Sequence, residues 1–172
     1  MKKSIFEIPI FEIEVDLNRI NIPDAPYKKT WQSGVQSTFS SGLNAPKETL
    51  LYLTEKISEC FEQLKDPIEG IQFCGIWRNK YNLDDFQDYH IHSVTNWSFV
   101  IYETVKVSRT QFLNPNMTGI LNQCHHNDSK DFPVMYKPKL KTGDMILFPS
   151  WLPHQVTSGN VGTTISGNIK CI

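Results

Sequence analysis

The stretch that most constrains this chain is residues 89–102 (YHIHSVTNWSFVIY), in which apolar, β-branched and aromatic side chains dominate. It contains neither proline nor glycine, and it therefore predicts a β-strand or a pair of strands. Side chains two residues apart on a strand point to the same face. We therefore expect His90 and His92 to present two imidazoles on one surface.

A third histidine, His154, follows residues 143–149 (GDMILFP). There a turn, an apolar strand and a proline come in succession, which indicates a sharp break that aims His154 inward. Three convergent imidazoles suit a first-row transition metal. The competing interpretation is that His90 and His92 are only hydrogen-bonded at a sheet surface.

The rest of the chain predicts one helix and many short strands. Residues 46–65 carry apolar side chains at helical spacing, whereas the region from residue 71 onward alternates strands and turns. This pattern favours a mainly β (α+β) fold, a sandwich or barrel buttressed by an N-terminal helix. One domain spanning residues 1–172 is expected from the length, with a helical and loop part at 1–70 and a β core at about 71–172. Irregular segments are expected at 16–44 and 118–138.

Composition excludes some function classes. The formal net charge of −1 gives no support for nucleic-acid or membrane binding driven by bulk charge. No apolar run approaches the ~18 residues of a membrane helix, and Glu7 and Pro9 interrupt any signal-peptide core. None of the four cysteines forms a CxxC pair. We therefore expect a cytoplasmic protein with reduced thiols and no membrane partner.

The motifs resemble a known family. The His-x-His pair with the run to Tyr102, the segment 143–156, and residues 164–168 (TISGN) are similar to phage and bacterial 2-oxoglutarate/iron(II)-dependent oxygenases. Trp77-x-Asn79 matches a further segment. The resemblance covers about residues 71–170. It implies a double-stranded β-helix, a jelly roll whose mouth holds one iron.

The resemblance also implies a ligand set. In that family a His-x-Asp/Glu pair and a distal histidine bind the metal and leave positions open for 2-oxoglutarate and oxygen. Carried over, His90 is the first ligand and His154 the distal one, while His92 stands at the carboxylate position. Either His92 binds the metal, or water or a carboxylate such as Asp88 completes the shell.

The expected cosubstrate site has one departure from the family. Residues on the strands next to the metal are expected to hold 2-oxoglutarate: Ser98, Tyr102, Thr164, Ser166 and Asn168. The family anchors the remote carboxylate with an arginine, and Gly162 occupies that position here. A bidentate guanidinium is hard to replace with a neutral group. Other candidate cations are Lys170, which shares the strand parity of Thr164, and Arg78, Lys80 and Arg109.

Three hypotheses follow from these residues. The first is an iron(II)-dependent dioxygenase that uses 2-oxoglutarate to hydroxylate a small molecule or a protein side chain. The second keeps the metal as Zn²⁺ with one open water, in a hydrolytic site. The third is a jelly-roll module without catalysis, such as a viral scaffold or binding protein. The missing arginine favours the third hypothesis, whereas the three histidines argue against it.

Overall fold

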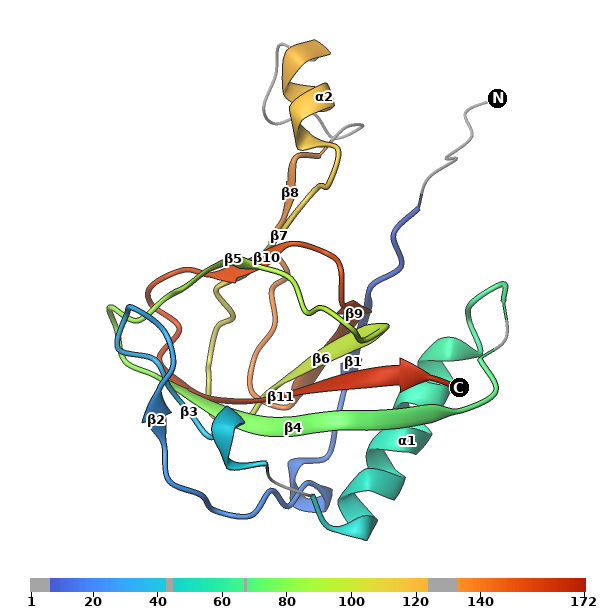
Figure 1. Ribbon diagram of the computed structural model, residues 1–172, viewed down its shortest axis with the longest axis vertical. Helices are drawn as coiled ribbons and strands as arrows, with labels where there is room; N and C mark the ends of the chain where they lie inside the picture. The colour runs from blue at the N-terminus through green and yellow to red at the C-terminus, as the bar shows by residue number, and fades with distance from the viewer. Residues whose placement is uncertain (1–6, 43–44, 67, 124–132) are drawn as a thin grey trace.

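Two antiparallel sheets form the framework of the computed structural model, which describes residues 7–42, 45–66, 68–123 and 133–172 (Figure 1). The larger sheet has the order β1-β9-β6-β11-β4-β3-β2, and the smaller has the order β5-β10-β7-β8. The strands are β1 (Phe11–Glu14), β2 (Lys28–Lys29), β3 (Gln36–Ser37), β4 (Ile71–Tyr81), β5 (Gln87–His90), β6 (Trp97–Tyr102), β7 (Thr110–Leu113), β8 (Met135–Tyr136), β9 (Asp144–Pro149), β10 (His154–Val156) and β11 (Gly162–Cys171). The mainly β fold predicted from the sequence is confirmed.

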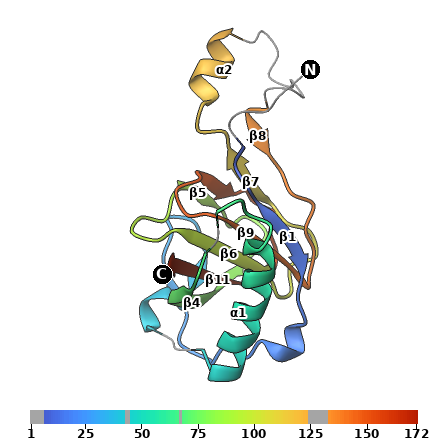
Figure 2. The same cartoon turned by 90° about the vertical axis from the view of Figure 1, so that its right-hand side faces the viewer.

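Helix α1 (Lys47–Phe61) covers the outer face of the larger sheet (Figure 2). Its side chains Leu53 and Ile57 are fully buried in a core cluster that also holds Phe99 of β6 and Ile165 of β11. Each apolar side chain of this size stabilises the fold by about 1.5–3 kcal/mol when fully buried. The helix therefore acts as a buttress, as its sequence pattern indicates.

The opposite face of the larger sheet points toward the smaller sheet. On β6, Phe99 and Ile101 face α1, whereas Val100 and Tyr102 pack in a second cluster with Phe112 of β7. This division follows from the two-residue period of a strand. The space between the two sheets is where the histidines lie.

The histidine-bearing stretch does not form one strand. Strand β5 ends at His90, and β6 begins at Trp97 in the other sheet. A turn joins the two strands, and within it Val94 adopts φ 63°. A positive φ is unusual for a β-branched residue. The prediction that His90 and His92 share one strand face is therefore wrong, because His92 lies in the connection.

The remaining differences concern segments expected to be irregular. Residues 16–44 contain two 3-10 helices, η1 (Leu17–Arg19) and η2 (Phe39–Ser41), besides β2 and β3. Helix α2 (Met117–Gln123) lies at the far end of an arm that continues β7 and β8 away from the sheets (Figures 1 and 2). No helix in the described ranges is both long enough and apolar enough to cross a membrane.

Candidate metal centre

Strand pairing in the smaller sheet brings two of the histidines together. His154 opens β10, directly opposite His90 of β5 in the strand register. The centroids of the two imidazole rings are 4.2 Å apart. Directly opposed residues on antiparallel strands have closely spaced side chains. Cross-strand pairing, rather than spacing along one strand, therefore joins His90 to His154.

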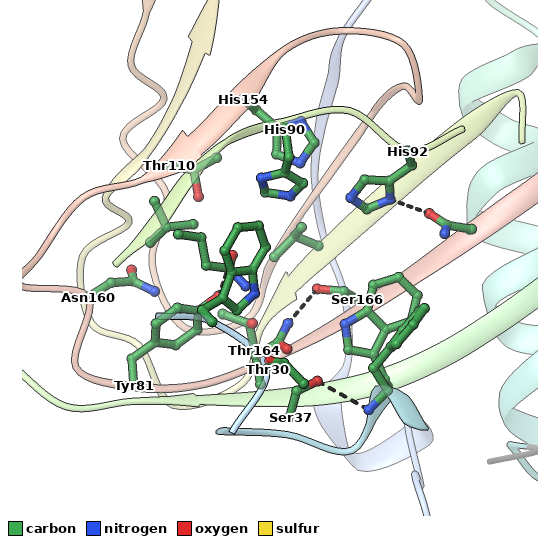
Figure 3. A pocket seen from close by; sticks show the side chains of 18 of the residues that line it. Thr30, Ser37, Tyr81, His90, His92, Thr110, His154, Asn160, Thr164 and Ser166 are labelled. Carbon is green, nitrogen blue, oxygen red and sulfur yellow. Dashed lines mark hydrogen bonds between the residues drawn. The ribbon is translucent and has the colours of Figure 1, made fainter. Parts of the chain in front are cut away.

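His92 reaches the same place from the connection after β5. Its backbone N–H donates to the carbonyl of Ser150 at 2.8 Å, which ties the connection to the end of β9. The ring centroid of His92 lies 5.4 Å from that of His90 and 5.1 Å from that of His154. One nitrogen atom from each of the three rings lies within 4.8 Å of the other two. The three imidazoles surround a common point (Figure 3).

Each imidazole is held through its Nδ1 atom. The acceptors are the carbonyl of Asp88 for His90 at 2.7 Å, the carbonyl of Leu152 for His154 at 2.9 Å, and Oδ1 of Asn168 for His92 at 2.5 Å. A carbonyl oxygen can only accept, so Nδ1 carries the hydrogen in each ring. Nε2 is then left with its lone pair. Oxygen acceptors hold metal-binding histidines in this same way, fixing both the tautomer and the ring orientation.

A chain of hydroxyl groups supports His92. The Thr95 hydroxyl donates to Ser150 Oγ at 2.9 Å, and Ser150 and Ser98 are joined at 2.8 Å. The Ser98 hydroxyl donates to Asn168 Oδ1 at 2.8 Å. Asn168 Oδ1 thus accepts from both Ser98 and His92. This network links β6, β11 and the residue that follows β9 to one imidazole, which makes the orientation of His92 depend on the large sheet.

Burial keeps the three imidazoles neutral. It lowers the pKa of His154 to about 3, and the nearby His90 ring adds to the effect. Burial also lowers the pKa of His90 and that of His92, although the hydrogen bonds to Asp88 and Asn168 act in the opposite direction. A metal binds the neutral imidazole. Near neutral pH the rings therefore need lose no proton to become ligands.

The histidines line a cavity of about 390 Å³ between the two sheets. Thr164, Ser166 and Asn168, predicted from the sequence to hold the cosubstrate, line it as well. Ser98 and Tyr102 lie outside its lining, with the Ser98 hydroxyl bonded to Asn168 and the Tyr102 hydroxyl bonded to Thr110 and Ser108. The roles of these five residues toward a cosubstrate stay predictions.

No aspartate, glutamate, lysine or arginine side chain lines the cavity in the described part of the chain. At Gly162, φ is +127°, and a Cβ there would meet Thr104 at 2.9 Å rather than enter the cavity. Lys170 is exposed, beyond a register shift that follows Asn168. The guanidinium of Arg78 is paired with Glu103 at 2.8 Å. Lys80 is exposed, and Arg109 lies against Gly159.

Sequence reasoning missed several cavity residues. Trp77, Asn79 and Tyr81 all line it, because they alternate along β4 and so share one face. That alternation was a readable signal in the sequence. Trp31 lies against His90, with ring centroids 4.8 Å apart, and Asn160 is fully enclosed. Both come from loops, where no periodic pattern marks an inward residue.

Comparison with known proteins identifies the family. Residues 75–165 match the family described as "Putative 2OG-Fe(II) oxygenase", a match that spans more than half of the chain and includes all three histidines. The chain belongs to the 2OG-Fe(II) oxygenase family. The family predicted from the sequence is thus confirmed. No curated protein sequence matches the chain.

Solved structures of 2OG-Fe(II) oxygenases share the fold of this family member. An oxidoreductase of the family from Burkholderia pseudomallei gives a TM-score of 0.55 at 11% identity, covering 84% of this chain and 71% of that one. The epimerase SnoN, solved with Fe³⁺, alpha-ketoglutarate and nogalamycin RO, gives 0.54 at 13%, covering 85% and 68%. HygX from Streptomyces hygroscopicus, solved with nickel, 2-oxoglutarate and hygromycin B, gives 0.51 at 9%, covering 95% and 82%. At these identities the likeness shows the fold alone, and it confirms the predicted double-stranded β-helix.

Proposed function

We propose that the chain is a non-haem iron(II)-dependent dioxygenase that uses a 2-oxo acid to hydroxylate a small molecule or a protein side chain. The orientation of the three imidazoles carries the proposal. All three Nδ1 atoms are held by oxygen acceptors, which leaves three Nε2 atoms for one metal. Membership of the 2OG-Fe(II) oxygenase family supplies the class of reaction.

The described residues fit a divalent first-row metal. His90, His92 and His154 would hold it as neutral nitrogen donors on three adjacent segments. When bound, iron together with a 2-oxo acid supplies the activation of dioxygen and the insertion of one oxygen atom into a C–H bond of the substrate. Asp88, the alternative ligand named from the sequence, accepts the Nδ1–H of His90 with its backbone carbonyl.

The chain's own part is to position groups and to exclude water. Asn168 holds His92, while the indole of Trp31 lies over His90 and that of Trp77 lies 6.0 Å from the His92 ring, centroid to centroid. Both indoles line the cavity beside the imidazoles. Hydroxylation of a C–H bond needs no side-chain general base, which suits a cavity whose described lining has no carboxylate.

2-Oxoglutarate fits this cavity in part. Its oxo-acid end is a chelating group suited to a metal that three histidines leave partly open. Its remote carboxylate would meet only neutral side chains among the described residues. A buried carboxylate without a cationic partner is costly. The metal and the oxo-acid end are therefore better supported than the remote carboxylate.

An anaerobic Fe(II) titration followed by visible absorption tests the proposal. We expect a charge-transfer band that requires iron, a 2-oxo acid and His154, and that is absent in His154→Ala. The matched control is Gln155→Ala, because the neighbouring Gln155 side chain donates to Gln111 and lies outside the cavity lining. Iron binding without the band would contradict the oxygenase proposal.

Three histidines without a carboxylate are also a ligand set for Zn²⁺. The same titration separates this second candidate, because metal analysis of the purified protein reports which ion the site retains. Zinc that Fe(II) cannot displace would favour the hydrolytic hypothesis. Absence of any metal dependent on His154 would favour the non-catalytic scaffold.

A further inference from the structure

Three buried polar side chains face the imidazoles from across the cavity: Tyr81 of β4, Thr164 of β11 and Asn160 of the loop before β11 (Figure 3). We call these three residues the inner end. Each is at most 4% exposed. A group that reaches the inner end therefore leaves water and depends on these side chains for its hydrogen bonds.

The hydrogen bonds already made at the inner end determine which donors and acceptors remain for a ligand. The Tyr81 hydroxyl donates to Oε1 of Gln87 at 3.0 Å, so its oxygen presents lone pairs to the cavity. Asn160 Oδ1 accepts from the backbone N–H of Arg109 at 3.2 Å, so its NH₂ group is the part left to donate. Burial raises the pKa of Tyr81, which keeps this hydroxyl protonated.

Thr164 is the second observation that points to a ligand. Its Oγ1 atom is buried and lies near the Tyr81 hydroxyl, but it makes no hydrogen bond of ordinary geometry in the described part of the chain. Buried polar atoms are nearly always hydrogen-bonded, and an exception needs an explanation. A ligand atom at the inner end would satisfy the Thr164 hydroxyl, which can both donate and accept.

A carboxylate suits this end poorly. A carboxylate only accepts hydrogen bonds, and beside Tyr81 it would face the lone pairs of an oxygen whose proton is committed to Gln87. No cation lines the cavity in the described ranges to offset its desolvation. A primary amide, in contrast, accepts from Asn160 or Thr164 and donates to Tyr81.

From these contacts we propose that the inner end binds an uncharged group that both donates and accepts hydrogen bonds, and that the 2-oxo acid used by this chain ends in such a group rather than in a second carboxylate. The inference rests on the proposed function and names the cosubstrate class of the same site. Thr164 and Tyr81 are then the residues that select the cosubstrate.

A matched pair of unreactive chelators tests the proposal. N-oxalylglycine carries a remote carboxylate, and N-oxalylglycinamide differs from it only in having a primary amide there. Calorimetric titration of each into the metal-loaded protein gives two dissociation constants without any turnover. We expect the amide to bind at least as tightly as the acid.

Thr164→Val provides the residue-level test, with Thr30→Val as the control because Thr30 lines the cavity at an exposed position. Loss of one neutral hydrogen bond is worth about 1 kcal/mol, so we expect Thr164→Val to weaken amide binding roughly fivefold. Because Thr164 Oγ1 makes no hydrogen bond of ordinary geometry with the described residues, this variant should fold with little change in stability.

The outcomes separate this inference from the proposed function. Tighter binding of the acid would overturn the inference alone, and would mean that the charge of the metal is felt at the inner end. Unchanged amide binding in Thr164→Val would also overturn it. Failure of both chelators to bind in a metal-dependent way would overturn the inference and the proposed function together.

Discussion

The imidazole of His92 donates its Nδ1–H to Oδ1 of Asn168, which stands 76 residues further along the chain on β11. Ser98 of β6 donates to the same oxygen. A residue that follows a strand in the smaller sheet is thus oriented by two strands of the larger sheet. The geometry of the candidate metal centre therefore depends on how the two sheets pack together.

Replacing Asn168 tests this dependence. Asn168→Ala removes the acceptor, and we expect metal affinity to fall about 10–100-fold, as for other groups that orient metal-binding histidines. Asn168→Asp keeps an oxygen in the same place and is expected to retain the affinity. Competition with a chromophoric chelator measures both. Equal affinity in wild type and a folded Asn168→Ala would contradict the positioning role.

The lowered histidine pKa values predict acid sensitivity in the metal-free protein. The pKa of His154 is about 3 in the fold and about 6.5 in the unfolded chain, so the unfolded chain binds more protons as pH falls. The stability linked to this group is fully present above about pH 6.5 and is lost as pH falls toward 3. Urea unfolding of wild type and His154→Gln between pH 7.5 and 5 should show their stabilities converging. A difference independent of pH would contradict the lowered pKa.

Gly167 of β11 packs closely against Phe99, in the core cluster that α1 covers. A Cβ at this position would overlap Cζ of Phe99. Overpacking of this kind costs about 1–3 kcal/mol, so we expect Gly167→Ala to lower the free energy of unfolding by that amount. Gly75, on the paired strand β4, has open space around its Cβ position. Gly75→Ala is therefore the matched control, and an equal loss in both variants would exclude the packing explanation.

The turn that carries the chain away from His92 holds backbone strain. Val94 adopts φ 63° and is 85% exposed, so its side chain contributes little packing. The left-handed conformation costs an L-residue roughly 1–2 kcal/mol, and asparagine tolerates it better. We expect Val94→Asn to raise the free energy of unfolding by up to about 1 kcal/mol. Destabilisation in chemical denaturation would contradict a strained turn.

The parts of the fold that sequence pattern predicted are those with a regular period. Helix α1 follows apolar spacing over several turns, and the inward residues Thr164, Ser166 and Asn168 follow strand alternation on β11. Local periodicity reflects which face is buried, so it can be interpreted without knowing the partner strands. The three histidines were also correctly expected to converge.

The errors arise where pairing between strands decides the outcome. No local signal shows that β5 ends at His90 and that the next strand joins the other sheet. Lys170 keeps the strand parity of Thr164, because Ile165, Ile169 and Cys171 all face the core under α1, but it lies exposed near the end of β11 and outside the cavity lining. How far along a strand the cavity extends depends on the neighbouring strands and is not visible in one sequence. Trp31 and Asn160 were missed because they lie in loops, where no periodic pattern marks an inward residue.

X-ray absorption of the Fe(II)-loaded protein under anaerobic conditions tests the central claim most directly, because it counts the imidazoles bound to the metal. The structure predicts three imidazole ligands from His90, His92 and His154 in the wild type, and two in His92→Ala. Two imidazoles in both proteins would show that His92 does not bind the metal. A shell without imidazole would contradict the proposed metal centre.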